Sequence, residues 1–214
     1  MKAPRAAHWL VTIALLLAGL AGCGERDRYD ALPHDAVVLA FGDSVTHGVG
    51  AGAGEDYPSQ LAALTGLRVV NAGVSGDTAR AARSRLQPLL AREQPDLVIV
   101  ELGGNDFLRK TSEQQVKAFL ADIIGAARGA GAQVVLVSVP RLSLLRASVG
   151  ALKDSAIYAE LAAEEGVILV PDTFSQILSD SALRADEIHP NAQGYRVLAD
   201  SIHAVMLDSG LLIN

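Results

Sequence analysis

Five short runs of apolar residues, separated by longer amphipathic stretches, constrain the fold of this chain more than any other feature. The runs are rich in β-branched residues and lie at 37–41, 68–71, 97–102, from 133 onward, and at 167–170. Helical patterns accompany them at 57–66, 78–92, 112–128, 152–165 and 191–207. The third run, LVIVEL, has the hydrophobicity of a strand buried on both faces. This alternation predicts one α/β domain, a three-layer α/β/α sandwich around a five-stranded parallel sheet.

The first 22 residues have the features of an export signal. Lys2 and Arg5 form a basic start, and the apolar core from Trp9 to Leu20 is shorter than the roughly 20 residues of a bilayer span. The following sequence LAGC resembles the lipobox of bacterial lipoproteins, which predicts a lipidated Cys23. We therefore expect a signal peptide at 1–22, the lipidated cysteine and a polar tether at 23–35, and a folded domain at 36–214.

Charge and cysteine content limit the kinds of partner that the protein is expected to bind. Acidic residues outnumber basic ones by 24 to 18, which disfavours binding to nucleic-acid phosphates. Cys23 is the only cysteine, so its lipidation leaves no thiol for a disulfide, a zinc site or a nucleophile. Gly24 follows it in place of the Asp that resembles an inner-membrane retention signal. We expect a membrane anchor through Cys23, in the outer membrane facing the periplasm if the cell has two membranes.

Four residues lie just after predicted strands, where ligands bind in open parallel sheets. They are Ser44 in FGDS, Gly73 in NAG, Asn105 in GGND and His189 in DEIHP. Each has a structural alternative, because serine caps helices while glycine and asparagine form turns. The nucleophile-elbow pattern G-x-S-x-G is absent, since Thr46 replaces its second glycine. Individually, these residues do not distinguish a catalytic site from ordinary caps and turns.

His189 is the candidate base with an orienting partner in sequence. Asp186 precedes it by three residues, a spacing that can fix the imidazole tautomer and stabilise the imidazolium. His47 lies closer to Ser44 in sequence, but its only nearby carboxylate is Asp43, so we favour His189. One His and one Asp are too few ligands for a metal site, and we expect neither a metal nor another cofactor.

In their chain order, GDS, the glycine of NAG, GGND and DxxHP resemble the four sequence blocks of the SGNH, or GDSL, hydrolase family. SGDT and ELGGND are similar to its bacterial thioesterase and lysophospholipase branch. The resemblance implies a flavodoxin-like fold with Ser44 as nucleophile, His189 as base and then acid, and Asp186 as its orienting partner. It further implies an oxyanion hole from the backbone N–H groups of Ser44 and Gly73 and the side-chain amide of Asn105.

The resemblance also implies the reaction, in which a serine esterase hydrolyses acyl esters or thioesters through an acyl-enzyme. The segment DFLRK at 106–110 and leucines 142, 144 and 145 either line an acyl pocket or pack loops. The only tryptophan lies in the export signal, so a carbohydrate O-acetyl esterase, which would use aromatic platforms, is the alternative. A non-catalytic binding lipoprotein is the second alternative, because a fold does not prove a function. His47 departs from the small residue usual in this branch.

Overall fold

A five-stranded parallel sheet forms the centre of the computed structural model, which describes residues 29–141 and 152–213. The strands are β1 (Val37–Gly42), β2 (Arg68–Gly73), β3 (Leu97–Glu101), β4 (Gln133–Val137) and β5 (Ile168–Val170). Their order across the sheet is β2-β1-β3-β4-β5, the flavodoxin-like order. The predicted fold class is confirmed, and all five strands coincide with the apolar runs.

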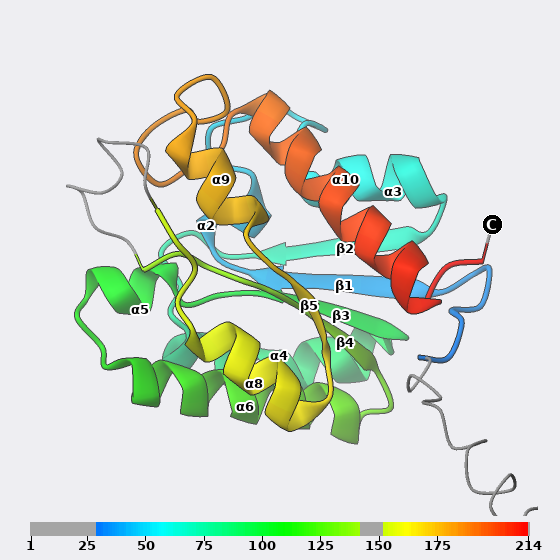
Figure 1. The fold of residues 1–214 in the computed structure, drawn as a ribbon. Helices are drawn as coiled ribbons and strands as arrows, with labels where there is room; N and C mark the ends of the chain where they lie inside the picture. Colours follow the sequence, from blue (N-terminus) through cyan, green and yellow to red (C-terminus); the bar gives the residue numbers. More distant parts are fainter. Residues whose placement is uncertain (1–28, 142–151, 214) are drawn as a thin grey trace, which may run out of the picture.

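Helices cover both faces of this sheet. They are α2 (Ser44–His47), α3 (Tyr57–Thr65), α4 (Ala79–Glu93), α5 (Gly104–Leu108), α6 (Glu113–Gly129), α8 (Ile157–Glu165), α9 (Thr173–Ser179) and α10 (Ala192–Ser209). Figure 1 shows α3, α9 and α10 on one face and α4, α6 and α8 on the other. The central strands are apolar except at their ends, such as Glu101 in β3, because both of their faces are covered.

The register of the central strands determines which loops meet at the site. In the β1–β3 pair, Val38 lies beside Leu97 and Gly42 beside Glu101. The segments that follow these strands, 43–47 and 102–108, therefore start next to each other at the carboxyl edge of the sheet. The short helices α2 and α5 are formed by these segments and lie at that edge, as does α9 (Figure 1).

Several predicted helix boundaries agree with the structure, and one differs. Ser112 caps α6, and Gly66 ends α3 in a left-handed conformation with φ of 73°. The helix predicted from residue 152 instead begins at Ile157. The preceding segment is extended, because Asp154 forms an antiparallel bridge with Pro140 next to the end of β4.

The described part of the predicted tether packs on the domain. The Tyr29 hydroxyl donates to the Gly166 carbonyl at 3.0 Å, and the Leu32 N–H donates to the Leu211 carbonyl at 2.8 Å. Apolar side chains at 29 and 32 pack against the core, and the first strand begins at Val37. The predicted signal peptide and Cys23 lie outside the described residues. Within 29–141 and 152–213, every helix is too short or too polar to cross a bilayer.

Candidate active site

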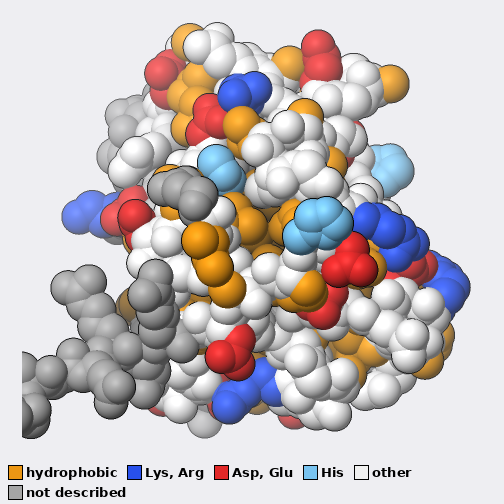
Figure 2. Space-filling model, turned by 90° about the vertical axis from the view of Figure 1, so that its right-hand side faces the viewer, with side chains coloured by type: hydrophobic (Ala, Val, Ile, Leu, Met, Phe, Trp, Pro, Cys, Tyr) orange, Lys and Arg blue, Asp and Glu red, His pale blue; other side chains and the backbone are white. Residues whose placement is uncertain are grey.

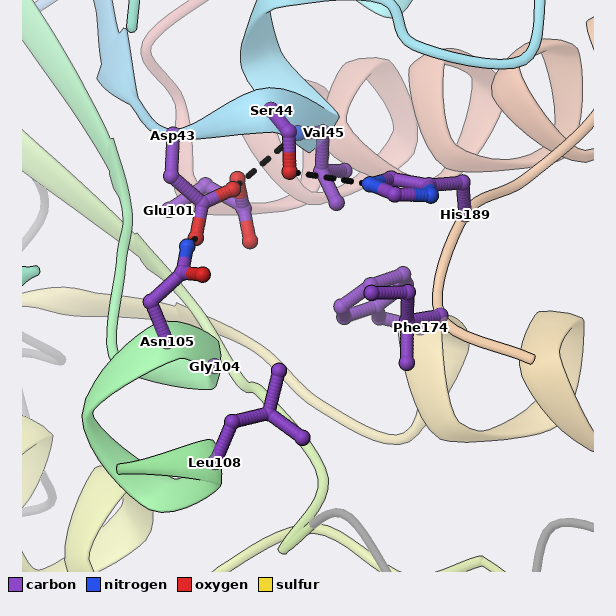
Figure 3. A pocket seen from close by; sticks show the side chains of 10 residues that line it. Asp43, Ser44, Val45, Glu101, Gly104, Asn105, Leu108, Phe174 and His189 are labelled. Carbon is purple, nitrogen blue, oxygen red and sulfur yellow. Dashed lines mark hydrogen bonds between the residues drawn. The ribbon is translucent and has the colours of Figure 1, made fainter. Parts of the chain in front are cut away.

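The structure brings Ser44 next to His189 and Asp186, which lie far from it in the chain, and Figure 3 shows Ser44 and His189 side by side. Ser44 is the first residue of α2, directly after β1, and the other two lie in the loop before α10. The Ser44 Oγ is 3.0 Å from His189 Nε2, and His189 Nδ1 is 2.8 Å from Asp186 Oδ2. These are hydrogen-bonding distances in the order nucleophile, base and orienting carboxylate.

The turn between β1 and α2 presents Ser44 at the edge of the sheet. Asp43 caps the helix, and its Oδ1 accepts a hydrogen bond from the Val45 N–H at 3.0 Å. A Cβ on Gly42 would contact the Thr46 hydroxyl and lie 2.5 Å from the Glu101 carbonyl oxygen, so only glycine fits there. Thr46, which replaces the elbow glycine, is fully buried in this turn. Ser44 is thus presented by a tight strand-to-helix turn that lacks the second elbow glycine.

Arg85 on α4 ties together the strand ends that flank this turn. Its guanidinium donates to the carbonyl of Gly42, at the end of β1, and to that of Ala72 on β2, both at 2.7 Å. It also pairs with Asp77 at 2.7 Å and stacks over the ring of Phe41. These contacts use the planar donor geometry of arginine to hold β1 and β2 in register at the site.

The loop around Asp186 fixes the orientation of its carboxylate. Oδ1 accepts the backbone N–H groups of Ile188 and His189, both at 2.8 Å. Partial burial acts to raise the pKa of Asp186, but hydrogen bonds from the His189 ring and these N–H groups outweigh it and hold the pKa below its usual value. The ionised carboxylate can only accept, so Nδ1 of His189 carries a proton and Nε2 accepts from Ser44.

Asn105 lies in the first turn of α5, across the site from His189 (Figure 3). Its Nδ2 donates to Asp43 Oδ2 at 2.9 Å. A primary amide has two N–H groups, so one remains for a substrate oxygen. Gly103, just before α5, has φ of 121°, and a Cβ there would collide with the Tyr158 hydroxyl. This glycine allows the tight turn that places Asn105 beside the nucleophile.

Gly73 is not brought to the site in the way the sequence predicted. Its N–H donates to Asn71 Oδ1 at 3.0 Å, and a Cβ on it would meet the backbone of Thr46 and His47. This corrects its expected oxyanion role, because its glycine character serves the close packing of β2 against α2. The open glycine of the same loop is Gly76, with φ of 80° and no atom within 4 Å of its Cβ position.

A buried pair of carboxyl groups, which the sequence analysis did not identify, lies beneath Ser44. Asp43 is 3% exposed and Glu101 is 1% exposed. Burial raises the pKa of Asp43 to about 6, although hydrogen bonds from Val45 and Asn105 oppose the change. Burial also raises the pKa of Glu101 well above its usual value, and the neighbouring Asp43 adds to this. The only sequence signal was an acidic residue within the apolar run LVIVEL.

Replacing Asp43 with Asn is expected to change how stability depends on pH. With its pKa raised from 3.8 to about 6, folded Asp43 binds a proton more tightly than unfolded Asp43. Its contribution is fully present below pH 4 and is lost as pH rises through 6, a loss of up to about 3 kcal/mol at pH 8. Asn cannot ionise. Urea unfolding at pH 4 and at pH 8 should show that, relative to wild type, the unfolding free energy of Asp43→Asn rises by up to that amount between the two pH values. The same difference between variant and wild type at both pH values would contradict the prediction.

A small cavity of about 280 Å³, counted out to open solvent, lies over these residues. Its apolar lining is made of Val45, Leu108, Phe174 and Ile188. Leu108, from the predicted segment 106–110, is 44% exposed and extends toward the cavity (Figure 3). The predicted wall leucines 142, 144 and 145 lie outside the described residues. Phe174 comes from α9, which the sequence analysis did not predict.

The remaining histidines lie apart from the catalytic hydrogen bonds. Ser44 bonds to His189 and not to His47, whose side chain is exposed at the end of α2. His34 is exposed before β1, and His203 is half-buried on α10. In the part of the chain that is described, no three His, Cys, Asp or Glu side chains gather as metal ligands.

A serine, a histidine and an aspartate joined by hydrogen bonds beyond the carboxyl ends of a 2-1-3-4-5 sheet have the arrangement of a serine-hydrolase site. The chain belongs to the GDSL-like lipase/acylhydrolase family, whose model matches residues 40–197. It is an enzyme that hydrolyses ester bonds. This family membership agrees with the resemblance drawn from the sequence blocks.

The chain is similar to several known relatives and solved structures of this family. It is 36% identical to thioesterase 1/protease 1/lysophospholipase L1 of Escherichia coli K12, over 76% of this chain and 79% of the relative. It is 35% identical to esterase TesA of Pseudomonas aeruginosa, over 72% and 79%. A crystal structure of TesA matches with a TM-score of 0.71 and 31% identity, covering 81% of this chain and 99% of that one.

Proposed function

We propose that this protein is a serine esterase for acyl esters or thioesters with an apolar acyl group, acting through an acyl-enzyme on Ser44. The observation that carries the proposal is the hydrogen-bonded series Ser44, His189 and Asp186, with distances of 3.0 and 2.8 Å. Similarity to a thioesterase/lysophospholipase and to an esterase supports the same reaction class. Serine is a weak nucleophile unless a base accepts its proton, and the series supplies that base.

The reaction follows from these positions. His189 Nε2 takes the Ser44 proton as Oγ attacks the substrate carbonyl, and Asp186 stabilises the imidazolium that forms. The oxyanion receives hydrogen bonds from the Ser44 N–H and the free N–H of the Asn105 amide. His189 then gives its proton to the leaving oxygen or sulfur. In the second half, His189 activates a water that cleaves the acyl-serine ester and restores Ser44.

The cavity lining supports an apolar acyl group. Four apolar side chains surround the space next to Ser44, and Phe174 is the one aromatic ring among them. Such a lining favours burial of an alkyl chain, at about 0.8 kcal/mol per CH₂. Sugar sites more often present several aromatic faces and hydrogen-bonding groups. The lining therefore favours acyl-chain esters over acetylated carbohydrates.

The substrate class can be tested with esters that differ only in the acyl group. We expect turnover of p-nitrophenyl butyrate and octanoate, of acyl thioesters and of lysophospholipid, with less activity on p-nitrophenyl acetate and acetylated xylan. Activity restricted to acetyl groups would instead indicate a carbohydrate O-acetyl esterase. Folded protein without any turnover would indicate a binding lipoprotein.

Phe174→Ala is expected to reduce the preference for longer acyl chains. Phe174 is 3% exposed and lines the cavity, so truncation removes apolar surface that the chain would contact. The ratio of kcat/KM for octanoate to that for acetate should fall about tenfold or more. Ile213→Ala is the matched control, because Ile213 is 79% exposed near the C-terminus and is not one of the residues that line the cavity. An unchanged ratio in Phe174→Ala would exclude this wall from acyl recognition.

We also propose that the protein is exported and held on a membrane through lipidated Cys23. The support is the LAGC sequence after an apolar core. Mass spectrometry of the mature amino terminus is expected to find an acylated Cys23. Cys23→Ser should release the protein from membranes, and membrane retention of the variant would contradict the proposal.

Such an anchor would leave the active site facing away from its own bilayer. Leu32 pairs with Leu211 at the far end of α10 from His189, and 18 helical residues span about 27 Å. Figure 2 shows this far side, where charged and apolar side chains are interspersed. The stretch from Cys23 to Tyr29 reaches at most about 20 Å. The tether is thus too short for the site to face the anchoring bilayer.

A further inference from the structure

Glu101 is a buried carboxyl group next to the active site that the reaction described above does not use. It is the last residue of β3 and is 1% exposed. Thr46 Oγ1 donates to its Oε2 at 3.1 Å, and its carboxyl group lies next to that of Asp43 at the same small cavity. Among residues 29–141 and 152–213, the ion pairs found involve neither Glu101 nor Asp43.

Two buried carboxyl groups without a cationic partner cannot both be charged at low cost. Burial and the proximity of Asp43 raise the pKa of Glu101 well above its usual value, whereas Asp43 reaches only about 6. Burial and mutual repulsion therefore favour a pair that shares one proton over a doubly charged pair. A protonated carboxyl group can donate, and an ionised carboxylate can only accept. Asp43 already accepts on both of its oxygens, at 3.0 and 2.9 Å, which leaves Glu101 as the donor of the pair.

Asp43 links the two halves of the site. Its Oδ1 accepts from the Val45 N–H at 3.0 Å, in the turn that carries Ser44, and its Oδ2 accepts from Asn105 Nδ2 at 2.9 Å (Figure 3). We propose that Glu101 is a positioning residue, which donates a hydrogen bond to Asp43 and thereby holds Asn105 in place to receive the oxyanion. The proposal rests on the esterase reaction at Ser44 and adds a residue to its supporting structure.

A continuous series of hydrogen bonds extends this support into the core. The Tyr57 hydroxyl on α3 lies 3.0 Å from Thr46 Oγ1, which in turn donates to Glu101. Tyr57 and Thr46 are both fully buried. The series therefore fixes one oxygen of Glu101, Oε2, as an acceptor. Fully satisfied networks of this kind hold their members in one geometry.

The groups that surround the pair determine what a pH profile reports. Three tyrosines face the pair formed by Asp43 and Glu101: Tyr57 from α3, Tyr158 from α8 and Tyr195 from α10. Two other titratable side chains also face it, His189 from the loop before α10 and Asp77 from the β2–α4 loop. Burial raises the pKa of all three tyrosines above the usual value, so they stay neutral. Asp77 is paired with Arg85. A shift of the acid limb of kcat in a Glu101 variant therefore reports the carboxyl pair.

The proposal predicts different behaviour for two variants of similar size. In Glu101→Gln, the amide N–H can replace the donor to Asp43 and the amide oxygen can accept from Thr46, so kcat should stay within a few-fold of wild type. In Glu101→Met, the donor is lost, and kcat should fall about 10- to 100-fold with KM nearly unchanged. The acid limb of kcat should also move to higher pH, because ionised Asp43 loses a stabilising hydrogen bond.

Melting curves establish that both variants fold, and infrared spectroscopy tests the proton directly. Wild type at neutral pH should show the carbonyl stretch of a protonated carboxyl group, and Glu101→Gln should lack it. The proposal would be overturned if Glu101→Met kept the kcat and the pH profile of wild type, or if both variants lost the same activity. Absence of the infrared band in wild type would also overturn it. The infrared result does not require turnover, so it separates failure of this proposal from failure of the esterase assignment.

Discussion

Ser44→Ala is expected to lower kcat for p-nitrophenyl butyrate by on the order of 10⁶, which is the loss typical of removing the nucleophile of a serine hydrolase. The reason is chemical, because His189 and Asp186 have no function in acyl transfer without an oxygen to activate. The variant should also fail to react with a fluorophosphonate probe, which labels activated serines. Both measurements address the same atom, Ser44 Oγ, which lies 3.0 Å from His189 Nε2.

The fold should survive this change. Asp43 still caps α2 through the Val45 N–H, and alanine favours a helix. Ser84→Ala is the matched control, since Ser84 is exposed on α4 and bonds only within its own helix. Wild type and Ser84→Ala should be labelled equally by the probe. Labelling of folded Ser44→Ala would mean that another residue is the nucleophile.

The sheet could be predicted because its strands are coded locally. Each run of β-branched residues became a strand, and each long amphipathic stretch became a helix, as periodicity dictates. The short helices α2, α5 and α9 were missed, because four to seven residues are too few to show a helical period. These helices carry Ser44, Asn105 and Phe174. The least predictable elements of the fold are therefore the ones that build the site.

The site itself was predicted in part, and the misses share one cause. Ser44, His189 and Asp186 follow from motif order and from a three-residue spacing. The family resemblance implied an oxyanion role for Gly73, but its packing against α2 depends on tertiary contacts that no local pattern encodes. The pairing of Asp43 with Glu101 likewise depends on the β1–β3 register. Sequence motifs can identify the residues that carry chemical groups. Which residues lie next to them across the sheet can be determined only from the folded structure.

Asn105→Ala is expected to lower kcat by 10²- to 10³-fold, about 3 to 4 kcal/mol, with little change in KM. The amide is a neutral donor that gains most when the carbonyl oxygen becomes an oxyanion, so its loss affects the transition state more than substrate binding. Its other N–H is held by Asp43 at 2.9 Å, which fixes the amide before substrate arrives. That preorganisation is what makes one hydrogen bond worth so much in the transition state.

Kinetics and labelling together test this role of Asn105. Slower fluorophosphonate labelling should accompany the loss in kcat, because the phosphonyl oxygen uses the same donors as the oxyanion. Asn105→Asp should be at least as impaired as Asn105→Ala, since an ionised carboxylate donates no hydrogen bond and repels both Asp43 and the oxyanion. A rise in KM with unchanged kcat would assign Asn105 to ground-state binding. Comparison of the effects on kcat and KM thus decides whether the Asn105 amide acts in the transition state or in substrate binding.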